Sequence, residues 1–184
     1  MKRRLFPVPI LATLLMLLAL HAPIPAGAAD WVAPGPGVGS PFPNTLNLED
    51  QKGRTRSLAD LMGTRGVTLV FVRSADWCPF CKRQLAELNT LAPEFEQLGY
   101  PLVSISVDAV PLIQKFAAQV GVRFTMLADP KGAINEQLGI RDAQYPVGSA
   151  AFGVPHPGMF VIDRGGQIRR KHFEKGYATR PDPQ

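Results

Sequence analysis

The chain has only two cysteines, Cys78 and Cys81, and they stand two residues apart where an apolar run gives way to an amphipathic one. Residues 67–72 predict a buried strand, and helical spacing of apolar side chains starts at Cys81. A strand that leads into C-x-x-C at the first turn of a helix is typical of a thiol–disulfide site. Unpaired N–H groups and partial positive charge at a helix N-terminus favour a thiolate over a thiol. Pro79 suits the first helical position, because its missing N–H needs no partner there.

Other interpretations of the two cysteines are weaker. A structural zinc site needs four ligands, and the sequence offers neither a second C-x-x-C nor paired histidines. A purely structural disulfide would gain little, since the loop it closes is so short. Two buried, inert cysteines remain an alternative. The spacing therefore favours a redox-active pair.

The N-terminus predicts an export signal over residues 1–29. Lys2, Arg3 and Arg4 form a charged head, residues 5–20 are mostly apolar, and residues 26–28 supply small side chains for cleavage. The mature chain would then begin near residue 29 or 30 and function in a bacterial periplasm. An uncleaved membrane anchor is the alternative, although the apolar run is short for a bilayer span.

The remaining chain of about 155 residues is enough for one domain. It carries 17 basic and 15 acidic residues and has no basic clusters interleaved with aromatic residues, so nucleic acid is not an expected partner. Residues 30–43 are rich in proline and glycine and predict an extended linker that lies on the domain or trails from it. Residues 44–184 are expected to form the domain.

Hydrophobic patterning in that domain alternates between strand and helix. Pro93 should kink the helix that follows the cysteines or split it near Leu91. The order of elements predicts an α/β fold with a central mixed sheet, flanking helices and a short N-terminal β extension. The expected strands are 44–48, 54–57, 67–73, 102–107, 125–128, 159–162 and 167–173, and the main helices follow Cys78, Pro111 and Asp129.

Three segments give the chain a resemblance to a known family: 44–58, FVRSADWCPFCKRQL (71–85) and PGMFVIDRGGQI (157–168). The chain resembles thioredoxin-fold redoxins, and within them the alkyl hydroperoxide reductase/thiol-specific antioxidant proteins. The resemblance implies that Pro157 is a cis-proline facing the cysteines, where it would let an incoming chain approach the sulfurs. Cys78, Cys81 and Pro157 are the catalytic residues that it predicts, with no cofactor.

The leading hypothesis is an exported thiol–disulfide oxidoreductase. Cys78, expected to be exposed, would attack a protein or small-molecule disulfide, and the more buried Cys81 would resolve the mixed disulfide. A membrane-linked donor is one source of electrons. Related reductases carry a helpful carboxylate near the second cysteine, where this chain has Val72 or Gln84.

The second hypothesis is a peroxiredoxin-like thiol peroxidase, with Cys78 attacking a hydroperoxide. Peroxiredoxins resembling this chain hold the peroxide with residues at positions that are Phe71, Ala75 and Pro157 here. Their loss predicts slow peroxidase activity. Arg73 and Arg141 are candidate substitutes.

The third hypothesis is a copper-binding protein that uses Cys78, Cys81 and His156, because thiolates and imidazole suit copper. Thioredoxin-fold copper proteins separate their cysteines by three residues rather than two. A histidine before a proline is also common in ordinary loops.

Overall fold

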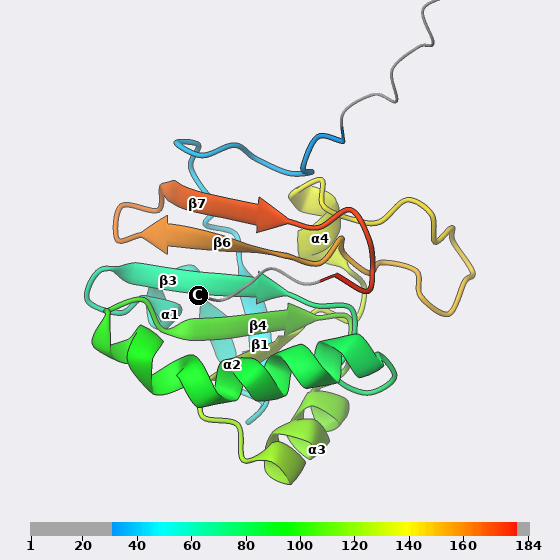
Figure 1. The fold of residues 1–184 in the computed structure, drawn as a ribbon, viewed down its shortest axis with the longest axis horizontal. Coiled ribbons are helices and arrows are strands. Elements are labelled where there is room, and N and C mark those ends of the chain that lie inside the picture. The colour runs from blue at the N-terminus through cyan, green and yellow to red at the C-terminus, as the bar shows by residue number, and fades with distance from the viewer. Residues whose placement is uncertain (1–30, 180–184) are drawn as a thin grey trace, which may run out of the picture. The chain divides into compact units, whose positions relative to one another are not determined.

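The computed structural model describes residues 31–179, so the predicted export signal, residues 1–29, lies outside the described residues. The seven strands form one sheet in the order β2-β1-β5-β4-β3-β6-β7 (Figure 1). Strands β3, β4 and β5 run parallel, and every other neighbouring pair is antiparallel. The predicted α/β fold with a central mixed sheet is confirmed. The strands are β1 Asn47–Asp50, β2 Thr55–Ser57, β3 Gly66–Phe71, β4 Leu102–Ser106, β5 Thr125–Ala128, β6 Gly158–Asp163 and β7 Ile168–Phe173, and the helices are α1 Leu58–Leu61, α2 Pro79–Gln97, α3 Val110–Val120 and α4 Ala133–Gln137.

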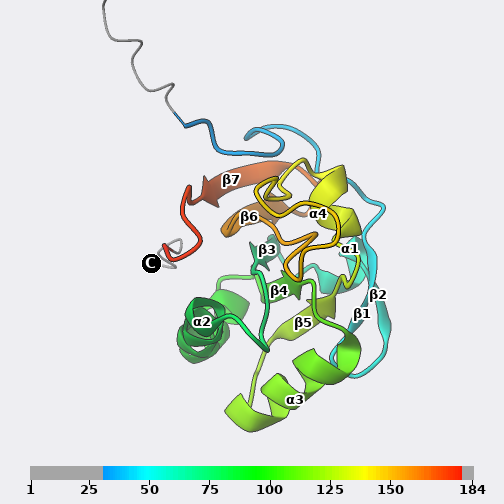
Figure 2. The same cartoon turned by 90° about the vertical axis from the view of Figure 1, so that its right-hand side faces the viewer.

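Strand β3 lies between β4 and β6 and is buried along its whole length. Side chains of a strand alternate between the two faces of the sheet, so β3 contributes to two hydrophobic clusters. Leu69 and Phe71 enter one cluster, while Val70 enters the other, which also holds the buried side of α2. Figure 2 shows α2 and α3 on one face of the sheet and α1 and α4 on the opposite face. The near-continuous apolar run thus encodes a central strand covered on both sides.

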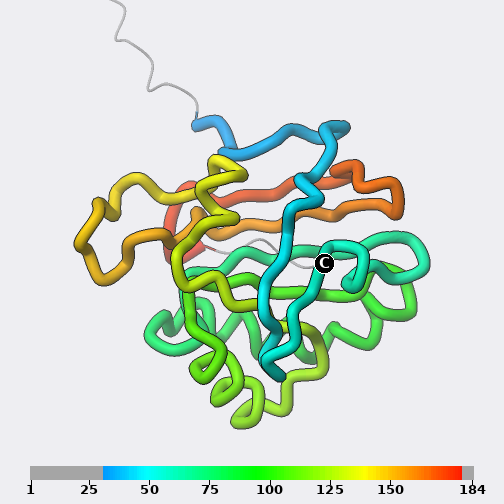
Figure 3. Tube along the Cα trace, turned by 180° about the vertical axis from the view of Figure 1, so that it is seen from behind, coloured from blue at the N-terminus to red at the C-terminus, as the bar shows by residue number. Residues whose placement is uncertain are grey.

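The proline- and glycine-rich lead lies along β7 (Figure 3). Gly39 N–H donates to the Ile168 carbonyl at 2.8 Å, and Ile168 N–H donates to the Ser40 carbonyl at 3.0 Å. Phe42 is buried and meets Phe160 edge to face. Lys171 holds the start of the lead by donating to two of its carbonyls, and burial lowers the pKa of that lysine. The lead therefore closes one end of the core.

Helix α2 is continuous from Pro79 to Gln97, so of the two predicted effects of Pro93, a kink or a split near Leu91, the split is wrong. A proline inside a helix removes the N–H that would bond to the carbonyl four residues earlier, here Asn89. That carbonyl instead accepts a hydrogen bond from Arg123 Nη2 at 3.1 Å. The Asn89 side chain makes two further bonds to the loop after α3, at Gly121 and Arg123. A distant side chain thus satisfies the group that the proline leaves unpaired.

Arg123→Met is expected to lower the free energy of unfolding by about 1 kcal/mol, because the Asn89 carbonyl loses its donor. In a Pro93→Ala background a backbone N–H becomes available for the same carbonyl, so the loss should shrink by about half a kcal/mol or more. Urea unfolding of the four proteins measures both values. Equal losses in the two backgrounds would contradict this account of α2.

Candidate active site

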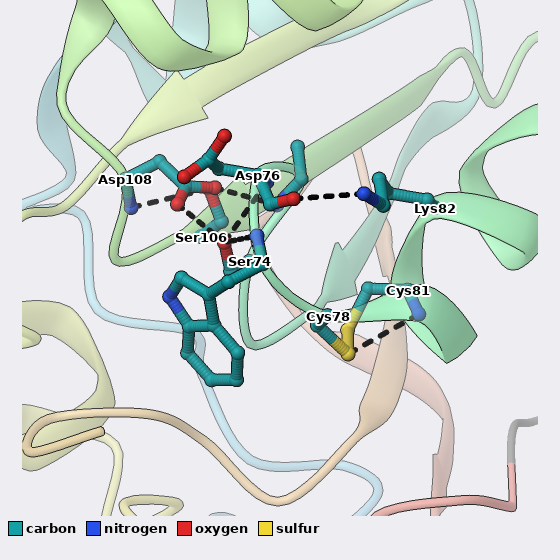
Figure 4. Close-up of a disulfide and its surroundings, with 9 residues drawn as sticks. Ser74, Asp76, Cys78, Cys81, Lys82, Ser106 and Asp108 are labelled. Atoms are coloured by element: carbon teal, nitrogen blue, oxygen red, sulfur yellow. Dashed lines mark hydrogen bonds between the residues drawn. A yellow bond between two sulfur atoms is a disulfide. The ribbon is translucent and has the colours of Figure 1, made fainter. Parts of the chain in front are cut away.

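The two cysteines are joined in a disulfide at the N-terminus of α2 (Figure 4). Their Cα atoms are 5.3 Å apart. Cys78 is the N-cap residue in extended backbone geometry, and its sulfur accepts a hydrogen bond from Cys81 N–H at 3.3 Å. Pro79 occupies the first turn, as predicted. The sulfur of Cys78 therefore lies where the helix directs an unpaired N–H and its positive end.

The expectation that Cys78 is exposed is wrong for this disulfide state. Its residue surface is 2% exposed, and that of Cys81 is 0%. Both belong to the cluster on the α2 side of the sheet, with Phe80 and Met159 packed partly against it. Phe80 comes from the helix turn itself and Met159 from β6, a distant strand that a local pattern does not reveal. Because both cysteines are buried, a partner can reach the pair only when the packing around it changes.

The loop between β3 and the cysteines is fastened by Asp108, just past the end of β4. Its buried carboxylate accepts from Ser74 Oγ at 2.6 Å, Ala75 N at 2.6 Å and Ser106 Oγ at 2.8 Å. Ser74 Oγ in turn accepts from the backbone N–H groups of the next turn, at Asp76 and Trp77. One carboxylate thus sets the path of the backbone that enters Cys78.

Sequence reasoning predicted a strand over residues 102–107 and gave no role to Asp108, the residue that follows it. The sequence did contain a signal for this contact, because the carboxyl ends of neighbouring parallel strands meet at one edge of a sheet. Ser74 follows β3 and Asp108 follows β4, and these strands pair in parallel. Asp129 follows β5 at the same edge, where burial raises its pKa although backbone N–H groups at the start of α4 donate to it.

Two basic side chains next to the pair have other partners. Lys82 Nζ donates to the Asp76 carbonyl at 2.9 Å, which closes the loop around Cys78 (Figure 4). Arg83 lies over the Phe80 ring, 5.6 Å from its centroid, and its Nε is 3.9 Å from Glu87. Lys82 therefore stabilises the loop before Cys78, and Arg83 is a solvent-facing charge on the helix.

Pro157 directly precedes β6, beside the end of β3. Gly158 pairs with Phe71, and the Pro157 carbonyl accepts from Glu174 N–H at 2.9 Å. This places Pro157 at the sheet edge from which the cysteine loop leaves. The prediction of a cis peptide bond at Pro157 is wrong, because every peptide bond among the described residues is trans. The backbone of Pro157 here is bonded to the segment after β7.

His156 does not join the cysteines in a metal site. Its ring Nε2 is 3.9 Å from Asp142 Oδ1, and its backbone N–H donates a hydrogen bond to the Ile140 carbonyl. Within residues 31–179 no three histidine, cysteine or acidic side chains are grouped so that they could hold a metal ion. The donor set proposed for copper is therefore not assembled in this structure.

The two arginines considered as peroxide-binding groups differ in their surroundings. Arg141 forms an ion pair with Glu136 and lies over the Phe152 ring. Arg73 is 6% exposed, and its guanidinium carbon lies 5.1 Å, 4.7 Å and 5.2 Å from the ring centroids of Trp77, Tyr145 and Tyr177 respectively. Sequence reasoning missed both tyrosines, which come from loops far apart in the chain.

Gln84 stands one turn beyond Cys81, where related reductases carry a carboxylate. It is 4% exposed, and its Oε1 has no hydrogen-bond partner among the described residues. A neutral amide accepts a proton far less readily than a carboxylate, so this position supplies no base to Cys81.

Comparison with known proteins decides the family. The profile of the AhpC/TSA family matches residues 38–171. The chain belongs to the AhpC/TSA family. Its relatives include alkyl hydroperoxide reductase E from Mycobacterium tuberculosis, 33% identical over 72% of this chain and 82% of the relative. Another is the thiol-disulfide oxidoreductase ResA from Geobacillus thermodenitrificans, 28% identical over 72% of this chain and 67% of the relative.

Solved structures agree on the fold. Peroxidoxin BcpB from M. tuberculosis has a TM-score of 0.63 at 25% identity and covers 77% of this chain and 86% of its own. A PrxQ mutant from Xylella fastidiosa has a TM-score of 0.65 at 20% identity over 79% and 88%, a likeness that concerns the fold alone. Between residues 31 and 179 there is no helix of the length and apolarity that a membrane span requires.

Asp108→Asn is expected to lower the free energy of unfolding by about 2 kcal/mol, because an amide replaces the charged acceptor of three buried donors. The matched control is Asp76→Asn, an exposed carboxylate in the same loop, which should change the value by no more than about 0.5 kcal/mol. Urea unfolding of the oxidised proteins measures both. If the two variants are equally stable, Asp108 does not anchor the loop.

Proposed function

We propose that this protein is an exported thiol–disulfide oxidoreductase that works through Cys78 and Cys81. The observation that carries the proposal is their pairing in one disulfide at the N-terminus of α2, in a chain of the AhpC/TSA family. The 28% identical ResA relative, named a thiol-disulfide oxidoreductase, supports the same chemistry. The substrates are protein or small-molecule thiols and disulfides.

The exchange proceeds in two balanced steps. The Cys78 thiolate attacks one sulfur of a substrate disulfide, so a mixed disulfide forms and the other substrate sulfur leaves as a thiolate. Cys81, after losing its proton, attacks Cys78 Sγ and releases the second substrate thiolate. Two electrons pass from the cysteine pair to the substrate, and the released thiolates take up protons. The reverse sequence oxidises a dithiol, and an external dithiol donor restores the reduced pair.

The proposal gives the two sulfurs different tasks, and their positions support it. Cys78 lies at the N-cap, beside the helix N–H groups that stabilise a thiolate, while Cys81 is one turn inside and fully buried. Since Gln84 offers no base, the leaving substrate thiolate or water takes the Cys81 proton. The second step is therefore expected to be slower than the first.

Replacing each cysteine separates these tasks. With dithiothreitol as donor and insulin as substrate, Cys78→Ser should lower reduction to the rate of dithiothreitol alone. Cys81→Ser, reduced beforehand and freed of dithiothreitol, should accumulate a mixed disulfide with the substrate, visible on a non-reducing gel, because no second thiol resolves it.

A second candidate is a thiol peroxidase, favoured by the 33% identical relative named alkyl hydroperoxide reductase E. Here the Cys78 thiolate would attack the terminal peroxide oxygen, giving a sulfenic acid and an alcohol. Condensation with the Cys81 thiol would then form the disulfide and release water.

The same variants decide between the two activities. Hydroperoxide consumption that is lost in Cys78→Ser and kept in Cys81→Ser, without turnover of disulfides, would favour the peroxidase. Full activity of Cys78→Ala in both the disulfide and the hydroperoxide assay would refute either role for the pair.

The export part of the proposal is supported by the charged, apolar and small-residue regions in residues 2–28. Expression with the native N-terminus in a Gram-negative bacterium should give periplasmic protein whose intact mass corresponds to a start at Ala29 or Asp30. Full-length protein in the membrane fraction would support an anchor instead. Full-length protein in the cytoplasm would contradict export.

A further inference from the structure

Arg73 is a buried cation without a carboxylate partner in the part of the chain that the structure describes. No ion pair involves it, and its Nε is buried without a hydrogen-bond acceptor. Removing such a charge from water is costly unless the charge is paired and hydrogen-bonded. Contacts with aromatic faces offset part of this cost but provide no hydrogen-bond acceptor for Nε–H. The guanidinium therefore retains unused capacity to bind an anion.

The rings of Trp77, Tyr145 and Tyr177 form an aromatic box around Arg73, next to the turn that carries the cysteines. One wall is Trp77, the residue before Cys78. Another is Tyr177, which also meets Phe80 edge to face with ring centroids 5.8 Å apart. Phe80 stands between the two cysteines in the chain, so the box lies next to the turn that carries the reactive pair.

Two walls of the box belong to irregular segments. Tyr145 lies in the long connection between α4 and β6, and Tyr177 lies in the short segment after β7. That segment descends from β7 toward α2 (Figure 2). Tyr177 is 49% exposed, so its displacement requires little loss of burial. Its movement would uncover Arg73 and the edge of Phe80 together.

We propose that Arg73 is a specificity-determining residue that binds a carboxylate of the substrate, carried close to the reacting disulfide. This inference rests on the proposed thiol–disulfide exchange. The carboxylate takes the place of the Tyr177 ring and accepts charge-assisted hydrogen bonds from the guanidinium, including the Nε–H that has no acceptor in this structure. The substrate disulfide then lies over Cys78, one residue from Trp77. The electrons and bonds follow the two exchange steps above.

The test compares two small disulfides that differ in charge: dithiodiglycolate, a dianion, and bis(2-hydroxyethyl) disulfide, which is neutral. Single-turnover rate constants of the reduced protein are measured with each. The readout is the ratio of the anionic to the neutral rate constant, because general damage to the site affects both. In Arg73→Gln this ratio should fall about tenfold or more, as expected for one lost charge-assisted hydrogen bond.

Two variants act as controls. Arg83→Gln removes an exposed charge that also lies beside the cysteine turn, and its ratio should stay within about twofold of the wild-type ratio. Arg73→Lys keeps the charge but loses the planar guanidinium, so its ratio should lie between that of the wild type and that of Arg73→Gln. An unchanged ratio in Arg73→Gln, or an equal fall in Arg83→Gln, overturns the proposal.

A binding measurement tests the anion site independently of the proposed exchange function. The chain has two tryptophans, so Trp31→Phe leaves Trp77, beside Arg73, as the only one. Thiodiglycolate, a thioether dicarboxylate that cannot exchange, should change its fluorescence saturably, and Arg73→Gln should abolish the change. If neither disulfide is reduced but this binding is present, the exchange function fails and the anion site stands. Absence of saturable binding overturns the anion site.

Discussion

The carboxylate of Asp108 is the interaction on which the rest of the site depends. Strand β3 ends at Phe71, and only the short loop before Cys78 separates it from α2. By accepting from Ser74 and Ala75, Asp108 fixes this loop to the end of the neighbouring parallel strand. The bond from Lys82 to the Asp76 carbonyl closes the other side. Cys78 is thereby held at the helix cap, where its sulfur meets Cys81 N–H.

The same packing that fixes the pair also hides it. Both cysteines are part of a hydrophobic cluster against which Phe80 packs, and the Phe80 ring in turn meets the Tyr177 ring. A covered disulfide is protected from indiscriminate exchange, whereas a covered thiolate would lose hydration. The helix N-terminus offsets part of that loss. Trp77 and Tyr177 are partly exposed and lie outside the strands and helices, so opening at these residues exposes less buried surface than opening the strand and helix core.

Local patterns in the sequence predict much of this architecture. The apolar run of β3, the proline in the first turn of α2 and the strands β4 and β5 are all found where the patterns indicate. These features depend on neighbours within a few residues. The continuity of α2 through Pro93 depends instead on Arg123, thirty residues away, and no helix rule contains that partner.

The site also combines features set by local sequence with features set by distant residues. Spacing alone identified Cys78 and Cys81, and the placement of proline at the first helical turn agreed with it. Burial of Cys78 was not predicted, because the hydrophobic cluster that contains it draws members such as Phe116 and Met126 from distant parts of the chain. The cis form of Pro157 came from resemblance and not from the residues themselves. In this chain the Pro157 carbonyl bonds to Glu174, and its peptide bond is trans.

The most direct test of the account is alkylation of the reduced protein with iodoacetamide at neutral pH, followed by mass mapping of the two cysteines. We expect Cys78 to be modified faster than free cysteine and well ahead of Cys81, while the protein stays folded. If Cys78 reacts only after unfolding, or no faster than Cys81, the helix-capped sulfur is neither reachable nor activated, and the proposed exchange chemistry is contradicted.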